Sequence, residues 1–164
     1  MKRNRLVLAA AVVAVLAAAA YVQVSAASTA NLAISANVSK NCSVATAPGA
    51  FGSYDPLSAT PLDVTGTVTV NCTRTTAAIV GLDLGQNASA SLRRMKSGTT
   101  EFLTYNLFSD SGRTTEWNTT ATQGYTSASK DTAKVYTVYG RVAAGQDALA
   151  LASYGDTVVA TVNF

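Results

Sequence analysis

Side chains that commonly do covalent or acid–base chemistry are sparse in this sequence. It contains no histidine, which excludes nucleophile–histidine pairs and histidine proton relays. None of the nine carboxylates belongs to a recognisable catalytic pair, although carboxylates distant in sequence can still converge in a fold. Neither common glycine-rich phosphate-binding pattern occurs. We therefore predict no catalytic residue, no cofactor and no metal site, and we expect that the protein is not an enzyme.

The first residues have the three parts of a secretory signal peptide. Residues 1–5 are basic, residues 6–22 are apolar and uncharged, and small residues follow at Val24-Ser25-Ala26. We predict export and cleavage after Ala26, with the bond one residue further on as the alternative. A retained membrane anchor is the competing interpretation. The apolar run is short for a membrane span, however, and consists mostly of weakly hydrophobic Ala and Val.

Removal of this leader changes the charge of the chain. Three of the 12 basic residues lie in the leader, so the mature chain carries nine basic and nine acidic residues. A chain without net charge gives no basis for binding nucleic acid or an anionic membrane surface. It is compatible with self-association, and its length suits one domain.

Cys42 and Cys72 are the two cysteines, and both lie in the mature part. In an exported protein, a single pair of cysteines most economically forms one structural disulfide. This bond would close a loop of about thirty residues and stabilise the fold by roughly 3–4 kcal/mol. A zinc site would need more Cys or His ligands than the sequence contains.

Alternation of apolar and polar residues with a period of two predicts that β-strands carry these side chains. We expect strands over residues 31–39, 62–72, 77–84, 92–95, 102–108, 135–142 and 156–164. Turns rich in Gly, Pro, Ser and Asn separate them, and the basic run 93–96 is expected to be a solvated strand end or turn. The pattern is typical of an all-β fold, a β-sandwich in one domain.

Two of the predicted strands lie at the ends of the mature chain. The segment 27–38 has no charge, proline or glycine, and its apolar residues occupy alternate positions: Leu32, Ile34, Ala36 and Val38. At the C-terminus, one face is shared by Val158, Ala160, Val162 and Phe164. Alternation alone favours the first segment as a strand of the chain's own sheet and the second as a buried core strand.

Short motifs occur in order along nearly the whole mature chain. They are Asn41-Cys42-Ser43-Val44, Phe51-Gly52-Ser53-Tyr54-Asp55-Pro56, Val68-Thr69-Val70-Asn71-Cys72-Thr73, Leu92-Arg93-Arg94-Met95, Leu103-Thr104-Tyr105-Asn106-Leu107-Phe108, Trp117, Val138-Tyr139-Gly140-Arg141-Val142 and Ser153-Tyr154-Gly155-Asp156. Each motif alone is weakly specific. As a set, they resemble the spore coat protein U domain, which is the domain of the Csu-type, or archaic, chaperone–usher pilins.

This resemblance implies an incomplete immunoglobulin-like β-sandwich of the pilin type over residues 39–164. Residues 1–26 would be the signal peptide, and residues 27–38 would be an N-terminal donor-strand extension. Its donor residues would be Leu32, Ile34, Ala36 and Val38. The C-terminal strand, with Val158, Ala160, Val162 and Phe164, would border the groove left by the missing strand.

The resemblance also implies partners and a location. In the periplasm, a chaperone would first fill the groove, and an outer-membrane usher would help to replace it with the extension of the next subunit, by β-augmentation. Other copies or related pilin subunits would be the final partners, in a pilus or coat at the cell surface with a role in adhesion and biofilm formation.

The alternative is a monomeric secreted or periplasmic module that binds a glycan or surface ligand through the loops at one end of a complete sandwich. The free, uncharged extension ahead of Cys42 favours the polymerising subunit, because a monomeric binder has no use for it.

Overall fold

The computed structural model describes residues 26–120, 122–150 and 152–164. The predicted signal peptide therefore lies almost entirely outside the described residues. The contacts divide the chain into two units, residues 1–36 and residues 37–164. Residues 26–41 contain no strand, and Leu32 and Ile34 are 83% and 85% exposed. No helix within the described residues is long and apolar enough to cross a membrane.

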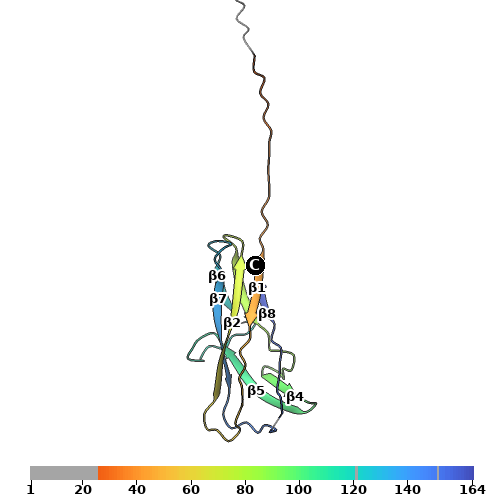
Figure 1. Cartoon of the computed structure of the whole chain (residues 1–164), viewed down its shortest axis with the longest axis vertical. Coiled ribbons are helices and arrows are strands. Elements are labelled where there is room, and N and C mark those ends of the chain that lie inside the picture. The colour runs from red at the N-terminus through yellow and green to blue at the C-terminus, as the bar shows by residue number, and fades with distance from the viewer. Residues whose placement is uncertain (1–25, 121, 151) are drawn as a thin grey trace, which may run out of the picture. The chain divides into compact units, whose positions relative to one another are not determined.

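The second unit is an all-β body with eight strands among the described residues (Figure 1). They are β1 (Cys42–Ala47), β2 (Leu62–Cys72), β3 (Ala77–Leu82), β4 (Arg93–Ser97), β5 (Glu101–Phe108), β6 (Gln123–Thr126), β7 (Lys134–Val142) and β8 (Ala160–Asn163). The predicted strands at 62–72, 77–84, 92–95, 102–108 and 135–142 are confirmed within one or two residues. The expected strand at 156–164 is shorter, and the strand expected over 31–39 is not formed, since these residues have no pairing partner within the described residues. The strands β1 and β6 were not predicted.

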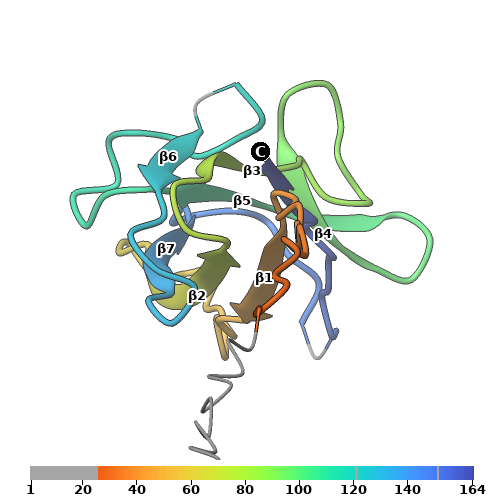
Figure 2. The same cartoon turned by 90° about the horizontal axis from the view of Figure 1, so that it is seen from above.

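The strands form two antiparallel sheets. One has the order β1-β2-β7-β5-β4 and the other has the order β6-β3-β8. Seen from above, β3 and β6 lie opposite β1, β2 and β7 (Figure 2). The main core cluster takes its buried residues from both sheets. This arrangement is the predicted β-sandwich.

The core follows from the alternation along the strands. On β2, Val68, Val70 and Cys72 are buried, while the residues between them are partly exposed. The facing strand β3 contributes Val80 and Leu82 to the same cluster. A period of two places alternate side chains on one face, so each strand supplies one row of the core.

The predicted disulfide is present and joins the first two strands. Cys42 and Cys72 are directly opposite each other in the register of β1 and β2. Beside them, the backbone of Asn41 continues the ladder, since its carbonyl accepts a hydrogen bond from Thr73 N–H at 2.9 Å. The start of β1 is therefore fixed to the end of β2 by a covalent bond and by hydrogen bonds.

Candidate functional site

The sandwich has two strand edges that face each other without a ladder between them. Within the described residues, β1 pairs with β2 alone and β8 pairs with β3 alone. The two strands nevertheless lie side by side and run in opposite directions, since the C-terminus lies beside the start of β1 (Figure 1). Unpaired edges expose backbone donors and acceptors that another strand can bind.

The register identifies which side chains of these two strands face inward. On β1, Val44 is opposite Val70 and Thr46 is opposite Val68, and both β2 residues belong to the core. Directly opposed residues of an antiparallel pair share a face, so Val44 and Thr46 point into the sandwich. Even so, Val44 is 42% exposed.

The same reasoning applies to β8. Ala160 is opposite Leu82 and Val162 is opposite Val80, which are core residues. Ala160, Val162 and the preceding Val158 pack against the core but stay only half-buried. The inward faces of both edge strands are thus mostly apolar, and they are incompletely covered.

A cleft of about 220 Å³ lies between these edges. Thr46 and Ala47 line it from β1, Val158 and Ala160 from the C-terminal segment, and the core side chains of β2, β5 and β7 form its floor. We call this cleft, with the two edges that flank it, the edge groove. Its walls are strand edges and its floor is mostly apolar, which is the chemistry that a β-strand with one apolar face requires.

A wider cleft of about 700 Å³ adjoins the edge groove at the end away from the disulfide. Both clefts are lined by Gly49, Phe51, Met95 and Asp156. Phe51 lies over Gly140 of β7, where a Cβ atom would come within 2.9 Å of the Phe51 ring. Glycine at 140 therefore makes room for Phe51, which packs edge-on against Tyr105 at 6.0 Å between ring centroids.

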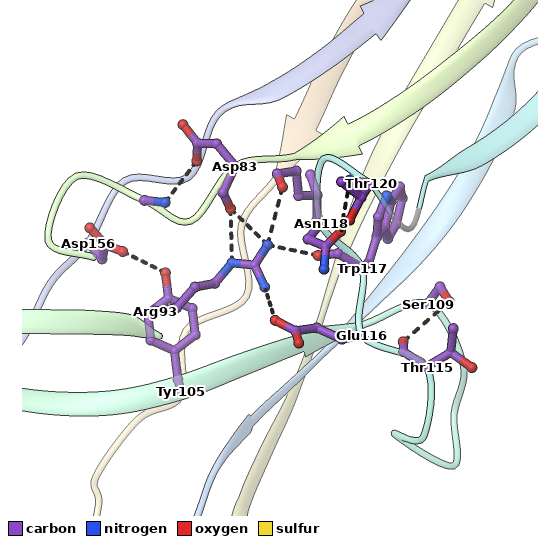
Figure 3. Close-up of polar contacts among 12 residues, drawn as sticks. Asp83, Arg93, Tyr105, Ser109, Thr115, Glu116, Trp117, Asn118, Thr120 and Asp156 are labelled. Carbon is purple, nitrogen blue, oxygen red and sulfur yellow. Dashed lines mark hydrogen bonds and ion pairs between the residues drawn. The ribbon is translucent and has the colours of Figure 1, made fainter. Parts of the chain in front are cut away.

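The β8 side of the groove is held in place by two carboxylates (Figure 3). Asp83, just after β3, accepts hydrogen bonds from the backbone N–H groups of Gly85 at 2.9 Å and Val159 at 2.8 Å. Asp156 accepts hydrogen bonds from Tyr105 Oη at 2.7 Å and Asn87 Nδ2 at 3.0 Å. These contacts tie the segment before β8 to the β3–β4 loop and to β5.

Arg93 joins the same region to the core from the other side (Figure 3). Its side chain is fully buried. Its guanidinium donates to the carbonyls of Asp83 at 2.8 and 2.9 Å, of Trp117 at 2.7 Å and of Leu82 at 3.3 Å. Nη1 is also paired with Glu116 at 3.3 Å. The expectation that residues 93–96 form a solvated cluster is wrong for Arg93, because β4 turns this side chain inward.

Burial shifts the pKa of two side chains in this network, Tyr105 and Arg93. Desolvation raises the pKa of the Tyr105 hydroxyl, and its hydrogen bond to Asp156 raises it further. Desolvation lowers the pKa of Arg93, while the nearby Glu116 carboxylate opposes that shift. Tyr105 is therefore a neutral hydrogen-bond donor over the whole physiological range. The Tyr105 hydroxyl is thus not suited to act as a base near neutral pH. The role of this network is to hold β3, β4 and the segment before β8 in position.

The structure places the predicted site residues in two groups. Val158, Ala160 and Val162 lie on the inward face of the C-terminal segment, whereas Phe164 is 53% exposed at its end. The expected donor residues Leu32, Ile34, Ala36 and Val38 are all exposed, and the first three belong to the separate N-terminal unit. No sequence signal identifies Arg93, Asp83 and Asp156 as a scaffold, because their partners are mostly backbone groups.

Comparison with known proteins agrees with this fold. The family model of the Spore Coat Protein U domain matches residues 28–161. Protein U of Myxococcus xanthus is 37% identical over 174 residues, with 94% of this chain and 97% of that protein covered.

Among solved structures, the fold is similar to a chain in the CsuC–CsuE chaperone–tip adhesion subunit pre-assembly complex from the archaic chaperone–usher Csu pili of Acinetobacter baumannii. The TM-score is 0.55 at 24% identity. The match covers 77% of this chain and spans 40% of the length of that chain. This likeness shows the fold, an all-β sandwich like that of a Csu pilus subunit.

Proposed function

The chain belongs to the Spore Coat Protein U domain family, and from this we propose that it is a structural subunit of a secreted pilus or coat. In this proposal, subunits polymerise when the N-terminal extension of one copy fills the edge groove of the next. The observation that carries it is the half-exposed, inward-facing Val44 beside an unpaired strand edge. An apolar side chain that faces the core yet stays exposed at an open strand edge is what a missing strand would leave.

The extension has the features that this groove requires. A strand in the groove has one face toward the apolar floor, and Leu32, Ile34, Ala36 and Val38 present one apolar face with a period of two. The segment 27–38 carries no charge, so its burial leaves no unpaired ion in the core. Its backbone would pair with both edges, as in β-augmentation.

Insertion also requires a movement of the groove. Adjacent strands lie about 4.8 Å apart, so a strand between β1 and β8 needs them about 9.6 Å apart. In the unfilled groove the two edges lie closer together than this over part of their length. A periplasmic chaperone that holds the edges apart, and an outer-membrane usher that exchanges it for the next subunit, would meet this requirement. Adhesion and biofilm formation at the cell surface are the roles we propose for the polymer.

The proposal is tested with two variants that each remove one half of the contact. Ile34→Asp places a charge on the apolar face of the donor and leaves the groove intact. Val44→Glu places a charge on the groove wall, where the side chain is already partly exposed, and leaves the donor intact. Ser35→Asp and Ser43→Glu change the same segments on the opposite face and serve as matched controls.

Material from the cell surface or periplasm is compared on gels, unheated and heated. The parent and both controls should give ladders of multiples that collapse to monomer on heating, because strand exchange makes kinetically stable polymers. Each groove or donor variant alone should give monomer. Mixed, the two should give a discrete dimer, since the one intact groove accepts the one intact donor and neither end can grow. Ladders from Ile34→Asp, or a parent that is a soluble monomer, would instead favour a self-complete binding module.

A further inference from the structure

We infer that the connection between the extension and β1 prevents the chain from filling its own groove, so that the extension is reserved for a second copy. This inference rests on the proposed function. It concerns residues 39–41, which are the link between the donor segment and the first strand of the body.

A chain that fills its own groove has to reverse direction just before β1. The extension leads into β1 through residues 39–41, and β1 then runs along the groove wall. To lie in the groove beside β1, the extension would have to form an antiparallel hairpin with it. The turn of that hairpin would fall at residues 39–41, immediately before Cys42.

Asn41 is not available for this turn. Its N–H donates to Thr73 Oγ1 at 3.2 Å, and its carbonyl accepts from Thr73 N–H at 2.9 Å. Asn41 thus continues the β1–β2 ladder, and its backbone groups point away from the groove. In a three-residue loop over 39–41, Asn41 would be the last residue, and in the common form of that loop the last residue has a positive φ. Asn41 is not among the residues with positive φ. Ser39 and Lys40 alone remain to reverse the chain.

A two-residue reversal puts the wrong face of the extension into the groove. With Ser39 and Lys40 as the turn, Val38 would be opposite Asn41, which places Ser35 opposite Val44 and Ala33 opposite Thr46. Because Val44 and Thr46 face inward and opposed residues share a face, Ser35 and Ala33 would enter the core. Ile34 and Leu32 would then face solvent, since a shift of one residue exchanges the two faces of a strand.

A wider turn does not remove the conflict at low cost. A four-residue turn over 38–41 gives the same wrong face. A five-residue turn over 37–41 restores the phase, but it takes Val38 out of the groove and again includes Asn41, which is bonded to Thr73. A donor from another copy has no turn to make, and it can slide to the register in which Leu32, Ile34, Ala36 and Val38 all face the floor.

The test is to lengthen the connection. A flexible linker of about six Gly and Ser residues between Ser39 and Lys40 spans about 13 Å and removes the constraint on phase, while Asn41 and the disulfide stay in place. The tethered extension would then compete at an effective concentration in the millimolar range. We expect the linker variant to be a monomer with a filled groove, with heat-sensitive multimers at least tenfold less abundant than in the parent.

Two further variants make the outcome decisive. The linker combined with Ile34→Asp should not close its own groove, so it should stay dependent on the chaperone for solubility. A second variant, with the linker between Val38 and Ser39, guards against misfolding caused by the first insertion site, and the fluorescence of Trp117 reports the folded body. If both linker variants fold and still polymerise like the parent, the inference is wrong. If Ile34→Asp also polymerises at the natural length, the proposed function fails as well, so the two failures are distinguishable.

Discussion

Two buried tyrosines differ in whether their hydroxyl has a hydrogen-bond partner. Replacing each of them with phenylalanine should therefore have opposite effects on stability. The hydroxyl of Tyr105 donates to Asp156 at 2.7 Å. The hydroxyl of Tyr136 is buried against the core and has no hydrogen-bond partner among the described residues. Tyr105→Phe therefore removes a hydrogen bond that stabilises the fold. Tyr136→Phe instead removes a hydroxyl whose burial without a partner destabilises the fold.

The sizes of the two effects follow from these partners. A hydrogen bond to a charged acceptor contributes about 1.5–3 kcal/mol, so Tyr105→Phe should lower the free energy of unfolding by about 2 kcal/mol. An unpaired buried hydroxyl costs about 1–3 kcal/mol, and with a small loss of packing Tyr136→Phe should raise that free energy by about 1 kcal/mol. For a body of this length, the two variants should differ in Tm by about 10 °C.

The assay is urea unfolding of the mature chain, followed by the fluorescence of its single tryptophan, the fully buried Trp117. A second series is run at increasing pH. The pKa of Tyr105 is raised above 10.0, mainly by burial, so above about pH 10 the unfolded chain loses a proton that the folded chain keeps. The tyrosine's contribution to stability is complete below pH 10 and declines above it. Tyr105→Phe should flatten this alkaline decline.

Equal destabilisation by the two variants would refute the reasoning. It would mean that the two hydroxyls are equally well satisfied, or that ring packing, rather than the hydroxyl, decides the energy at both sites. A Tyr105→Phe variant with the parent's alkaline profile would show that the proton of Tyr105 does not contribute to stability.

Three further predictions concern the scaffold around the groove. Replacing both cysteines with serine should lower the free energy of unfolding by roughly 3–4 kcal/mol, since the disulfide closes a separation of 30 residues; unchanged urea midpoints would contradict this. Gly85→Ala should be severely destabilising, because φ is +81° and a Cβ would clash with the carboxylate of Asp156. The control Gly98→Ala, with φ +58° and open space around it, should lower the free energy of unfolding by about 1 kcal/mol. Similar decreases in Tm for the two variants would argue against a clash at Gly85. The hydrogen bond from Arg141 lowers the pKa of Asp63, so this carboxylate stabilises the fold above about pH 3.9 and loses that effect as the pH falls further. Asp63→Asn should flatten the acid unfolding profile, and a profile equal to that of the parent would contradict this.

The sequence predicted those parts of the fold in which periodicity coincides with burial. β2 is predicted with its observed bounds because Val68, Val70 and Cys72 lie on one buried face. β1 was missed because its residues are mostly small and exposed and because it follows directly on the extension. Its strand character comes from pairing with β2, a contact distant in sequence that alternation does not report.

The polar scaffold of the groove could not be predicted for a different physical reason. Arg93 follows Leu92 and precedes another arginine, so its composition indicates a solvated surface. Its burial depends on carbonyls of Leu82, Asp83 and Trp117, which converge from two other segments. Backbone carbonyls occur at every position and leave no mark in a sequence, so such a site becomes visible only once the chain is folded.

Under the proposed function, the attachment of the groove walls explains how the open sandwich keeps its register before a donor strand enters. The wall on the β1 side is fixed by the disulfide and by the pairing of Asn41 with Thr73. The opposite wall is fixed by Asp83, just after β3, and by Asp156, at the end of the groove that adjoins the larger cleft. Neither set of contacts uses the free edges of β1 and β8, so filling the groove need not break any of them. The pairing of Asn41 with Thr73 keeps β1 in register. We infer that the same pairing stops the extension from turning back. The stability of the open groove and its preference for a second copy then have one structural cause.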